Sequence, residues 1–326
     1  MNTPKILIIG ANGQIGSELT QALAQRYGAQ SVITSDISAQ GRAENMALGV
    51  RHLALDATDG DAIKAAVEAH AVTQIYLLAA ALSARGEQHP GWAWDLNMKS
   101  LLHVLELART HNLRVFWPSS IAAFGPNSPK SMTPQRCVMD PTSVYGISKL
   151  AGEGWCAWYH RNYGVDVRSL RYPGLISRKT PPGGGTTDYA VEIFHAALLR
   201  GHYTSFLSAD TSLPMMYMPD AIRATLELMD APSSSVHERS SYNLAGPSFT
   251  PAQIAAVIRR HIPDFTIDYA PDFRQTIADS WPQSIDDTVA QKDWGWKAAF
   301  DLDAMVNDML THLRPRIAQA AERLAA

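Results

Sequence analysis

The first half of the chain alternates between short hydrophobic runs and longer segments with helical periodicity. Residues 5–9 form a continuously apolar run rich in β-branched side chains, as expected of a strand that is buried on both faces. The same alternation predicts strands over 31–35, 51–55, 74–81, 114–119 and 166–170, with helices over 17–27, 61–69 and 94–111 between them. Repeated strand–helix units predict an α/β fold with a doubly wound parallel sheet, whose ligands lie at the carboxyl ends of the strands.

The second half shows a weaker pattern. Helices are predicted over 250–261 and 301–313, with a short strand over 266–269 between them. Pro315 lacks a backbone N–H, so we expect it to interrupt the last helix.

Composition restricts the possible function classes. The chain has 326 residues, of which 46% are hydrophobic, which is enough for one large domain or two closely joined lobes. The net charge is −3 and no basic block occurs, so nucleic acid is not an expected partner. The longest apolar run, at 75–82, is too short to span a bilayer, and the N-terminal run is too short for a signal peptide.

Cysteine and histidine positions give no metal or disulfide signature. The two cysteines, Cys137 and Cys156, are too far apart for a CxxC motif, and no HExxH motif occurs among the 11 histidines. We therefore expect a cytoplasmic protein that binds no metal and does not associate with a membrane.

A glycine-rich turn follows the first predicted strand and precedes a predicted helix. Its glycines are Gly10, Gly13 and Gly16, and Gln14 and Ile15 belong to the same turn. Glycines let the turn close and let its backbone approach a pyrophosphate, while the helix N-terminus offers free N–H groups. Three spaced glycines alone would equally mark a plain turn, but this context predicts a dinucleotide-binding site.

An acidic residue ends the second predicted strand. Asp36 lies 20 residues after Gly16, where a Rossmann carboxylate binds the adenosine ribose hydroxyls. A carboxylate there would repel a 2′-phosphate, so we expect NAD rather than NADP. We expect an NAD-binding Rossmann domain over 1–172, to which parts of 213–245 return, and a smaller substrate-binding lobe over 173–326.

A tyrosine and a lysine lie four positions apart in a segment that begins a predicted helix. Tyr145 and Lys149 therefore share one helical face. A free phenol has a pKa of about 10, and a neighbouring cation favours its phenolate. Such a tyrosine can take a proton from an alcohol while hydride leaves the same carbon. A Tyr and a Lys at this spacing are more often ordinary surface residues, and the upstream nucleotide signature is what favours the catalytic interpretation.

Taken in order, these features resemble the extended short-chain dehydrogenase/reductase superfamily. The matching positions are Gly10-x-x-Gly13-x-x-Gly16, Asp36, Asp56-Ala57, Ser120 before Phe124-Gly125, Tyr145-x-x-x-Lys149 and Arg171-Tyr172-Pro173-Gly174. The resemblance implies that Tyr145 is the general base, that Lys149 lowers its pKa, and that Ser120 orients the substrate oxygen. It implies a cofactor site made of Gly10, Gly13, Gln14, Ile15, Gly16, Asp36, Asp56, Ala57, Leu78, Ala79, Ala80, Asn97, Tyr145, Lys149 and Tyr172.

The second half resembles the short-chain type of L-threonine 3-dehydrogenase, through residues 83–87, 181–190, 213–221 and 280–287. The resemblance implies that NAD oxidises L-threonine to 2-amino-3-ketobutyrate in a homodimer without metal. It implies a substrate site made of Ser83, Ser120, Tyr145, Gly184, Thr186 and Trp281. Arg178 is either a further contact for the substrate carboxylate or an ordinary surface arginine.

Two other functions share these motifs. A nucleotide-sugar epimerase or dehydratase has the same fold and the same Tyr/Lys pair, but needs a larger substrate lobe with basic residues for a diphosphate. A non-catalytic NAD sensor would bind the cofactor and tolerate loss of Tyr145. The intact Ser120, Tyr145 and Lys149 set argues against the sensor.

Overall fold

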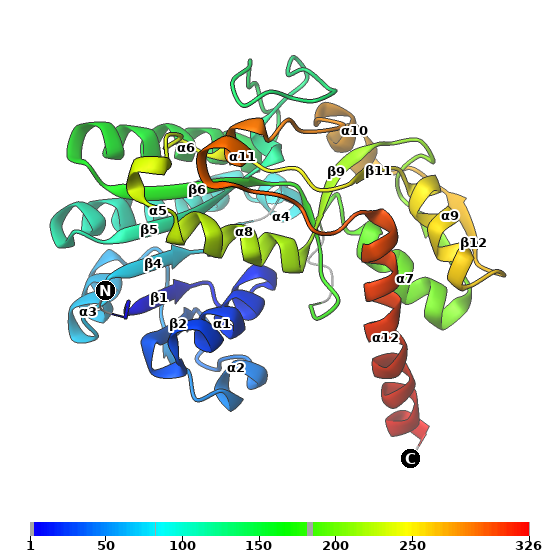
Figure 1. Ribbon diagram of the computed structural model, residues 1–326, viewed down its shortest axis with the longest axis horizontal. Coiled ribbons are helices and arrows are strands. Elements are labelled where there is room, and N and C mark those ends of the chain that lie inside the picture. The colour runs from blue at the N-terminus through cyan, green and yellow to red at the C-terminus, as the bar shows by residue number, and fades with distance from the viewer. Residues whose placement is uncertain (1–2, 82, 181–184, 326) are drawn as a thin grey trace.

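The computed structural model describes residues 3–81, 83–180 and 185–325. Its centre is a seven-stranded sheet in the order β10-β6-β5-β4-β1-β2-β3, and every pairing in it is parallel (Figure 1). The strands are β1 (Ile6–Ile9), β2 (Val32–Asp36), β3 (Arg51–Ala54), β4 (Gln74–Leu77), β5 (Arg114–Ser120), β6 (Asp166–Tyr172) and β10 (Tyr242–Asn243). This is a doubly wound Rossmann sheet, which confirms the predicted fold class.

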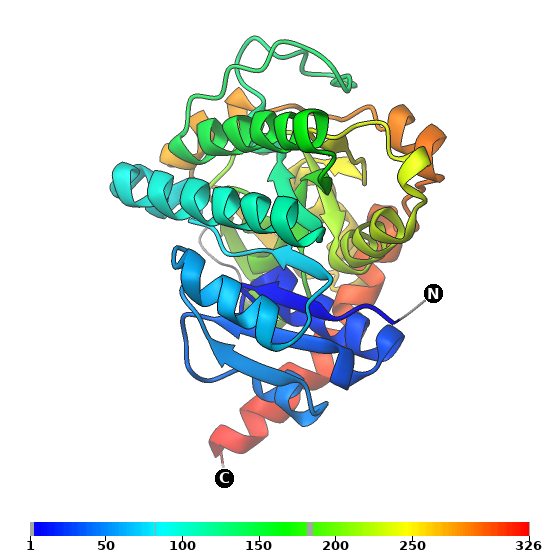
Figure 2. The ribbon, with the colours of Figure 1, turned by 90° about the vertical axis from the view of Figure 1, so that its left-hand side faces the viewer.

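Side chains alternate along the strands and enter two separate hydrophobic layers. Ile6 and Ile8 of β1 pack on one face, and Leu7 and Ile9 pack on the other. The first face is covered by α1 (Gln14–Tyr27) and α8 (Met218–Asp230), and the second by α3 (Gly60–Ala69), α5 (Pro90–His111) and α6 (Val144–Tyr163). Figure 2 shows α5 and α6 lying side by side outside the sheet. Shorter helices are α2 (Ala43–Ala47), α4 (Ser83–Gln88) and α11 (Thr288–Trp294).

A second group of elements has its own core beside the main sheet. A three-stranded sheet has the order β11-β9-β7, and a parallel pair joins β12 to β8. The strands are β7 (Gly174–Ile176), β8 (His202–Ser205), β9 (Leu213–Tyr217), β11 (Ser248–Phe249) and β12 (Thr266–Tyr269). Helices α7 (Tyr189–Arg200), α9 (Pro251–His261), α10 (Phe273–Ser280) and α12 (Leu302–Ala325) complete the group. The methionines of β9 are fully buried packing residues, because Met215 and Met216 are both 0% exposed.

The last helix departs from the sequence-based expectation. Pro315 lies inside α12, which continues through it to Ala325, so the predicted interruption is wrong. Thr311 and Pro315 are both exposed. Water can therefore bond to the Thr311 carbonyl that loses its helical N–H partner, and the proline costs less than it would in a buried helix.

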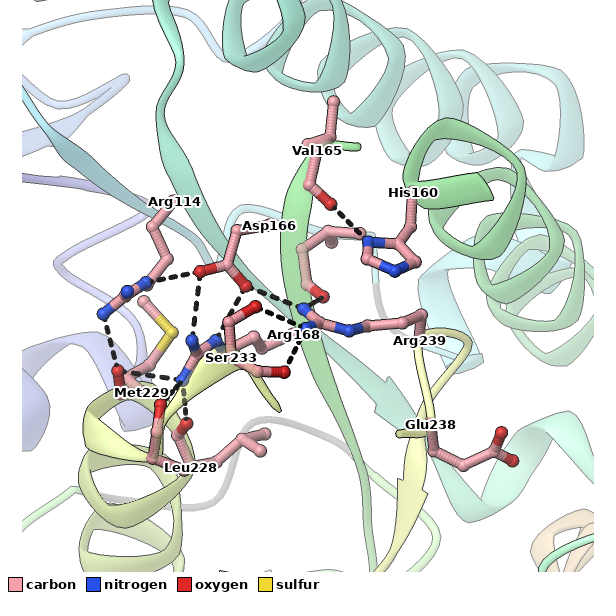
Figure 3. Close-up of polar contacts among 12 residues, drawn as sticks. Arg114, His160, Val165, Asp166, Arg168, Leu228, Met229, Ser233, Glu238 and Arg239 are labelled. Atoms are coloured by element: carbon pink, nitrogen blue, oxygen red, sulfur yellow. Dashed lines mark hydrogen bonds and ion pairs between the residues drawn. The ribbon is translucent and has the colours of Figure 1, made fainter. Parts of the chain in front are cut away.

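Three arginines surround Asp166 at the amino end of β6 (Figure 3). Its carboxylate accepts hydrogen bonds from Arg114 Nε at 2.8 Å, Arg168 Nε at 2.9 Å and Arg239 Nη1 at 2.7 Å. Arg168 also donates to carbonyls at the C-terminal end of α8, among them Leu228 at 2.6 Å. Burial alone would raise the pKa of Asp166, but the hydrogen bonds and charges of the arginines hold it well below its usual range. The cluster therefore joins the amino ends of β5 and β6 to the C-terminal end of α8.

We predict that Asp166→Asn destabilises the protein by about 3 kcal/mol, because it leaves the fully buried guanidinium of Arg168 without its compensating charge. Urea unfolding of the variant measures the change. The matched control is Asp95→Asn, which removes an exposed carboxylate paired with Lys99 and should change stability by less than about 1 kcal/mol. Because the pKa of Asp166 is lowered in the fold, its contribution is complete above the unfolded value of about 4 and falls as pH drops below it. Equal losses in the two variants at neutral pH would contradict a special role for Asp166.

Candidate active site

The glycine-rich turn lies against the end of β4. Gly10 has φ of +86°, and a Cβ there would come within 2.4 Å of the Ala79 amide nitrogen. A Cβ on Gly16 would come within 2.5 Å of the Gly10 carbonyl oxygen, whereas one on Gly13 would approach the same oxygen only to 3.4 Å. Gly10 and Gly16 are therefore needed for the conformation of the turn itself. Gly13 is not, and its missing side chain leaves space on the side of the turn that faces the cavity.

Asp36 ends β2 beside this turn. Its carboxylate accepts hydrogen bonds from the Asn12 N–H at 3.0 Å and the Ser38 N–H at 3.4 Å. Arg42 approaches the same turn and donates from Nε to the Asn12 carbonyl at 2.9 Å. Asp56 follows β3 and accepts from the Thr58 N–H and hydroxyl, both at 2.8 Å.

A cavity of about 580 Å³ lies at the carboxyl ends of β1, β4, β5 and β6, where the strand order reverses. The sequence-predicted residues that line it are Gly10, Gly13, Gln14, Ile15, Gly16, Leu78, Ala80, Ser120, Tyr145, Lys149, Tyr172, Thr186 and Trp281. Thr186 and Trp281 come from the second group of elements, so the cavity has a wall from each group. Ligands of open α/β sheets bind at such a position.

Some predicted residues lie outside this lining. Asp36, Asp56, Ala57, Ala79 and Asn97 do not border the cavity. Ser83 begins α4, but its side chain is outside the described residues, as is Gly184. Arg178 borders a different cavity and pairs with Asp308 at 2.5 Å, so its guanidinium is already engaged away from the predicted substrate site.

Asn97 is a structural link between the sheet and the helix that carries Tyr145. It is buried, its Oδ1 accepts from the Ala81 N–H at 2.8 Å, and its Nδ2 donates to the Ser148 hydroxyl at 2.9 Å. It therefore fixes α6 against the segment that follows β4.

Tyr145, Lys149 and Ser120 converge on the cavity. The Ser143 side chain caps α6 by accepting from the Gly146 N–H at 3.0 Å, which places Tyr145 in the first turn. Lys149 is buried, donates from Nζ to the Pro118 carbonyl at 2.6 Å, and lies 5.4 Å from the centre of the Tyr145 ring. Ser120 hydrogen-bonds to Tyr145.

Burial dominates the electrostatics of the pair. It raises the pKa of Tyr145 to about 12, with the Ser120 hydrogen bond acting in the opposite direction. Burial also lowers the pKa of Lys149 to about 7, while the charges of Cys156 and Glu153 oppose that shift. Lys149 was expected to lower the pKa of Tyr145, but in the protein without cofactor the effect of burial is larger and the pKa is raised. A low-dielectric site disfavours both charged forms, and it favours the phenolate only when further positive charge is present.

Sequence inspection missed the polar network beneath Lys149. Glu153 accepts from the Ser119 hydroxyl at 2.6 Å and from Arg171 Nε and Nη2 at 2.9 and 2.8 Å. Arg171 also donates to Asn243 Oδ1 at 2.9 Å, and Asn243 donates to the Asp286 carbonyl at 3.0 Å. The spacing of Glu153, four residues after Lys149 on one helical face, was the available signal.

The site is suited to a dinucleotide on structural grounds. The glycine turn opens on the cavity at the N-terminus of α1, and Lys149 supplies a donor beside it. Among the described residues, no group of three His, Cys, Asp or Glu side chains could hold a metal ion. In the same part of the chain, no helix is both long and apolar enough to cross a membrane.

Comparison with known proteins gives a family and several close structures. The sequence profile described as "NAD dependent epimerase/dehydratase family" matches residues 6–245. A protein of Staphylococcus haemolyticus named as an uncharacterized epimerase/dehydratase is 47% identical over 307 residues, which are 94% of this chain and 96% of the relative.

Solved structures of L-threonine dehydrogenases are similar over almost the whole chain. The GalE-like enzyme of Cupriavidus necator in its holo form is 66% identical with a TM-score of 0.93, covering 95% of this chain and 100% of that one. The Phytophthora infestans enzyme is 47% identical with a TM-score of 0.92, covering 96% and 99%. UDP-glucose 4-epimerase of Thermotoga maritima, 24% identical with a TM-score of 0.81 and covering 96% and 99%, shares the fold.

We predict different outcomes for alanine at two glycines of the turn. Gly16→Ala should lower the thermal midpoint by several degrees, because the new Cβ overlaps the Gly10 carbonyl. Gly13→Ala should keep the wild-type midpoint but weaken NADH binding by at least about tenfold, since its Cβ meets only an ordinary contact inside the protein and projects where a pyrophosphate would lie. Thermal unfolding and NADH fluorescence titration measure the two effects. Unchanged NADH affinity in Gly13→Ala would contradict the assignment of this turn to the cofactor.

Proposed function

This chain belongs to the NAD dependent epimerase/dehydratase family, and on that basis we propose that it is an NAD-dependent dehydrogenase that oxidises L-threonine at its 3-hydroxyl to 2-amino-3-ketobutyrate. The observation that carries the proposal is a single cavity bordered by the glycine turn, by Ser120, Tyr145 and Lys149, and by Thr186 and Trp281. Identities of up to 66% to solved L-threonine dehydrogenases support the choice of substrate.

The cofactor would be held by the turn and by Asp36. The pyrophosphate would lie on the backbone of Gly10 to Gly16 at the start of α1, and Asp36 would bind the adenosine ribose and disfavour NADP. Leu78, Ala80 and Tyr172 border the remaining cavity, and Lys149 would bind the nicotinamide ribose. When bound, NAD⁺ accepts the hydride from C3 of the substrate and brings a positive charge near Tyr145.

Proton transfer is the task of the protein's own residues. Ser120 would bind the 3-hydroxyl and orient it toward Tyr145, whose phenolate oxygen takes the proton. Because burial outweighs the Ser120 hydrogen bond and raises the pKa of Tyr145 to about 12, the phenolate would need the positive charge of Lys149 and of the oxidised cofactor. We therefore expect Tyr145 to abstract the proton only when both NAD⁺ and the substrate are bound. Without them the tyrosine stays a neutral phenol.

The proposed substrate subsite lies on the side of the cavity away from the glycine turn. Thr186 is buried and Trp281 is 7% exposed, so together they offer one hydroxyl and one apolar wall, suited to a small amino acid. Ser83 and Gly184 belong to the proposal through the family resemblance. A nucleotide-sugar epimerase is the second candidate, because the curated relatives carry epimerase/dehydratase names.

We also propose a homodimer in the cytoplasm. Trp155 and Trp158 on α6 are each 39% exposed and pack edge to face, with ring centroids 5.8 Å apart and an interplanar angle of 80°. Trp92 and Trp94, near the start of α5, are also exposed. Pairing of these two helices with a second copy would bury this aromatic surface. A similar solved enzyme is described as monomeric, so light scattering at micromolar concentration is the test, and a mass of 35.6 kDa would contradict the dimer.

The substrate test is NADH formation with L-threonine, measured beside NADP⁺, L-allo-threonine, L-serine and a panel of UDP-sugars. Turnover with L-threonine and NAD⁺, weak with NADP⁺, is the expected result. Conversion of a UDP-sugar by protein that retains its NAD through purification, with no amino acid oxidised, would instead assign the epimerase function.

We predict that Tyr145→Phe lowers kcat by at least about a hundredfold, which is the low end for a general acid–base group. NADH binding should survive, because the cofactor contacts of the turn are unchanged. The control is Tyr163→Phe, which alters an exposed tyrosine at the end of α6 and should leave kcat unchanged. Near-normal turnover of Tyr145→Phe would remove Tyr145 from the mechanism, and no turnover in the wild type would favour the NAD-sensor alternative.

A further inference from the structure

A second cavity, of about 700 Å³, lies beside the cofactor cavity between α1 and α12. One wall is a single face of α1, formed by Ser17, Gln21 and Gln25 at four-residue spacing. The opposite wall is one face of α12, and the segment 178–180 joins the two walls. In Figure 1, α12 extends downward at the right, to the level of α1 and α2, and the residues that line the groove come from α1, α12 and the segments 42–48 and 178–180.

Basic side chains outnumber acidic ones in the lining of the groove. Its lining contains Arg42, Arg178, Lys179, His312 and Arg316, and Glu44 is the acid on it. Three of these basic side chains lie near carboxylates next to the groove, and one of them is His312, whose Nδ1 is 3.4 Å from Asp308 Oδ1. Arg178 pairs with Asp308 at 2.5 Å, and Lys179 lies 3.9 Å from Glu18.

Arg42 and Arg316 keep their charge available. Neither forms an ion pair with a described residue. Arg42 is held through its Nε, which bonds to the Asn12 carbonyl at 2.9 Å, so its terminal nitrogens remain for another acceptor. Arg316 donates from Nη1 to the Arg178 carbonyl, which holds its side chain at the wall formed by segment 178–180. A bound anion would find two guanidinium groups in this groove that no described carboxylate neutralises.

We propose that this groove is a binding site for a small phosphate-bearing anion, distinct from the cofactor site. Guanidinium groups match the planar, bidentate geometry of phosphate oxygens, and the side-chain amides of Gln21 and Gln25 add neutral donors. The volume leaves room for a phosphate-bearing ligand larger than inorganic phosphate or pyrophosphate.

The groove is next to the cofactor site without being part of it. Arg42 and Thr180 border both cavities, whereas the glycines of the turn border only the first. An anion in the groove would therefore lie behind α1, on the opposite side of Arg42 from the proposed pyrophosphate position. The inference goes beyond the proposed dehydrogenase activity and does not depend on threonine being the substrate.

The test is isothermal titration of the full chain with inorganic pyrophosphate at low ionic strength, with the cofactor site first saturated with NADH. We expect one pyrophosphate bound per chain. Arg316→Gln should weaken that binding by about fivefold or more, because it removes one charge-assisted hydrogen-bond donor. Arg316→Lys keeps the charge and should bind more tightly than the glutamine variant.

The matched control is Arg161→Gln, which removes an exposed arginine on α6, far from the groove, and should leave pyrophosphate binding unchanged. Absence of binding in the wild type, or equal weakening in Arg161→Gln and Arg316→Gln, would overturn the proposal. Pyrophosphate binding to the NADH-free protein but not to the NADH-saturated protein would place the anion in the cofactor cavity and would also overturn the proposal. NADH fluorescence and threonine turnover test the proposed dehydrogenase, whereas pyrophosphate titration tests the groove. A negative result for anion binding is therefore distinguishable from a negative result for the proposed function.

Discussion

The buried ion pair between Glu153 and Arg171 is the contact on which the arrangement of the site depends. Two charges inside a protein cost a large desolvation energy unless their geometry is good and their remaining hydrogen-bonding groups are filled. Here the guanidinium bonds both carboxylate oxygens, Ser119 donates to the acid, and Asn243 accepts from the arginine. These bonds hold the ion pair in a single arrangement. Through them the pair joins α6 to β5, β6 and β10.

The hydrogen-bond network around this ion pair extends to the segment that forms the opposite wall of the cavity. Asn243 donates to carbonyls of Thr133 and Asp286, and Thr133 forms a parallel bridge with Ile285. The segment that carries Trp281 is thus tied, through a few buried polar groups, to the helix that carries Lys149. A site with walls from two groups of elements needs such a link, because loops that pack only at the surface would let the walls move independently.

The same burial that orders the site opposes its chemistry. It raises the pKa of Tyr145 and lowers that of Lys149, so the protein by itself favours a neutral phenol. In the proposed mechanism the oxidised cofactor restores the balance, because its positive charge favours the phenolate. In that mechanism, ionisation of Tyr145 would depend on cofactor binding, which would not be so for a surface-exposed Tyr/Lys pair.

The sequence by itself determined the strand–helix order, the parallel sheet and the glycine turn, because these depend on local periodicity and on backbone conformations that few residues adopt. It also indicated Ser120, Tyr145 and Lys149, since parallel strands bring their carboxyl ends to one edge. It misjudged Pro315, whose cost depends on whether the neighbouring carbonyl meets water. Only the tertiary structure decided that Arg178 pairs with Asp308, that Glu153 and Arg171 lie near Lys149, and that Arg42 borders two cavities. These contacts join residues far apart in the chain or depend on how buried a group becomes, and no local pattern of residues encodes either property.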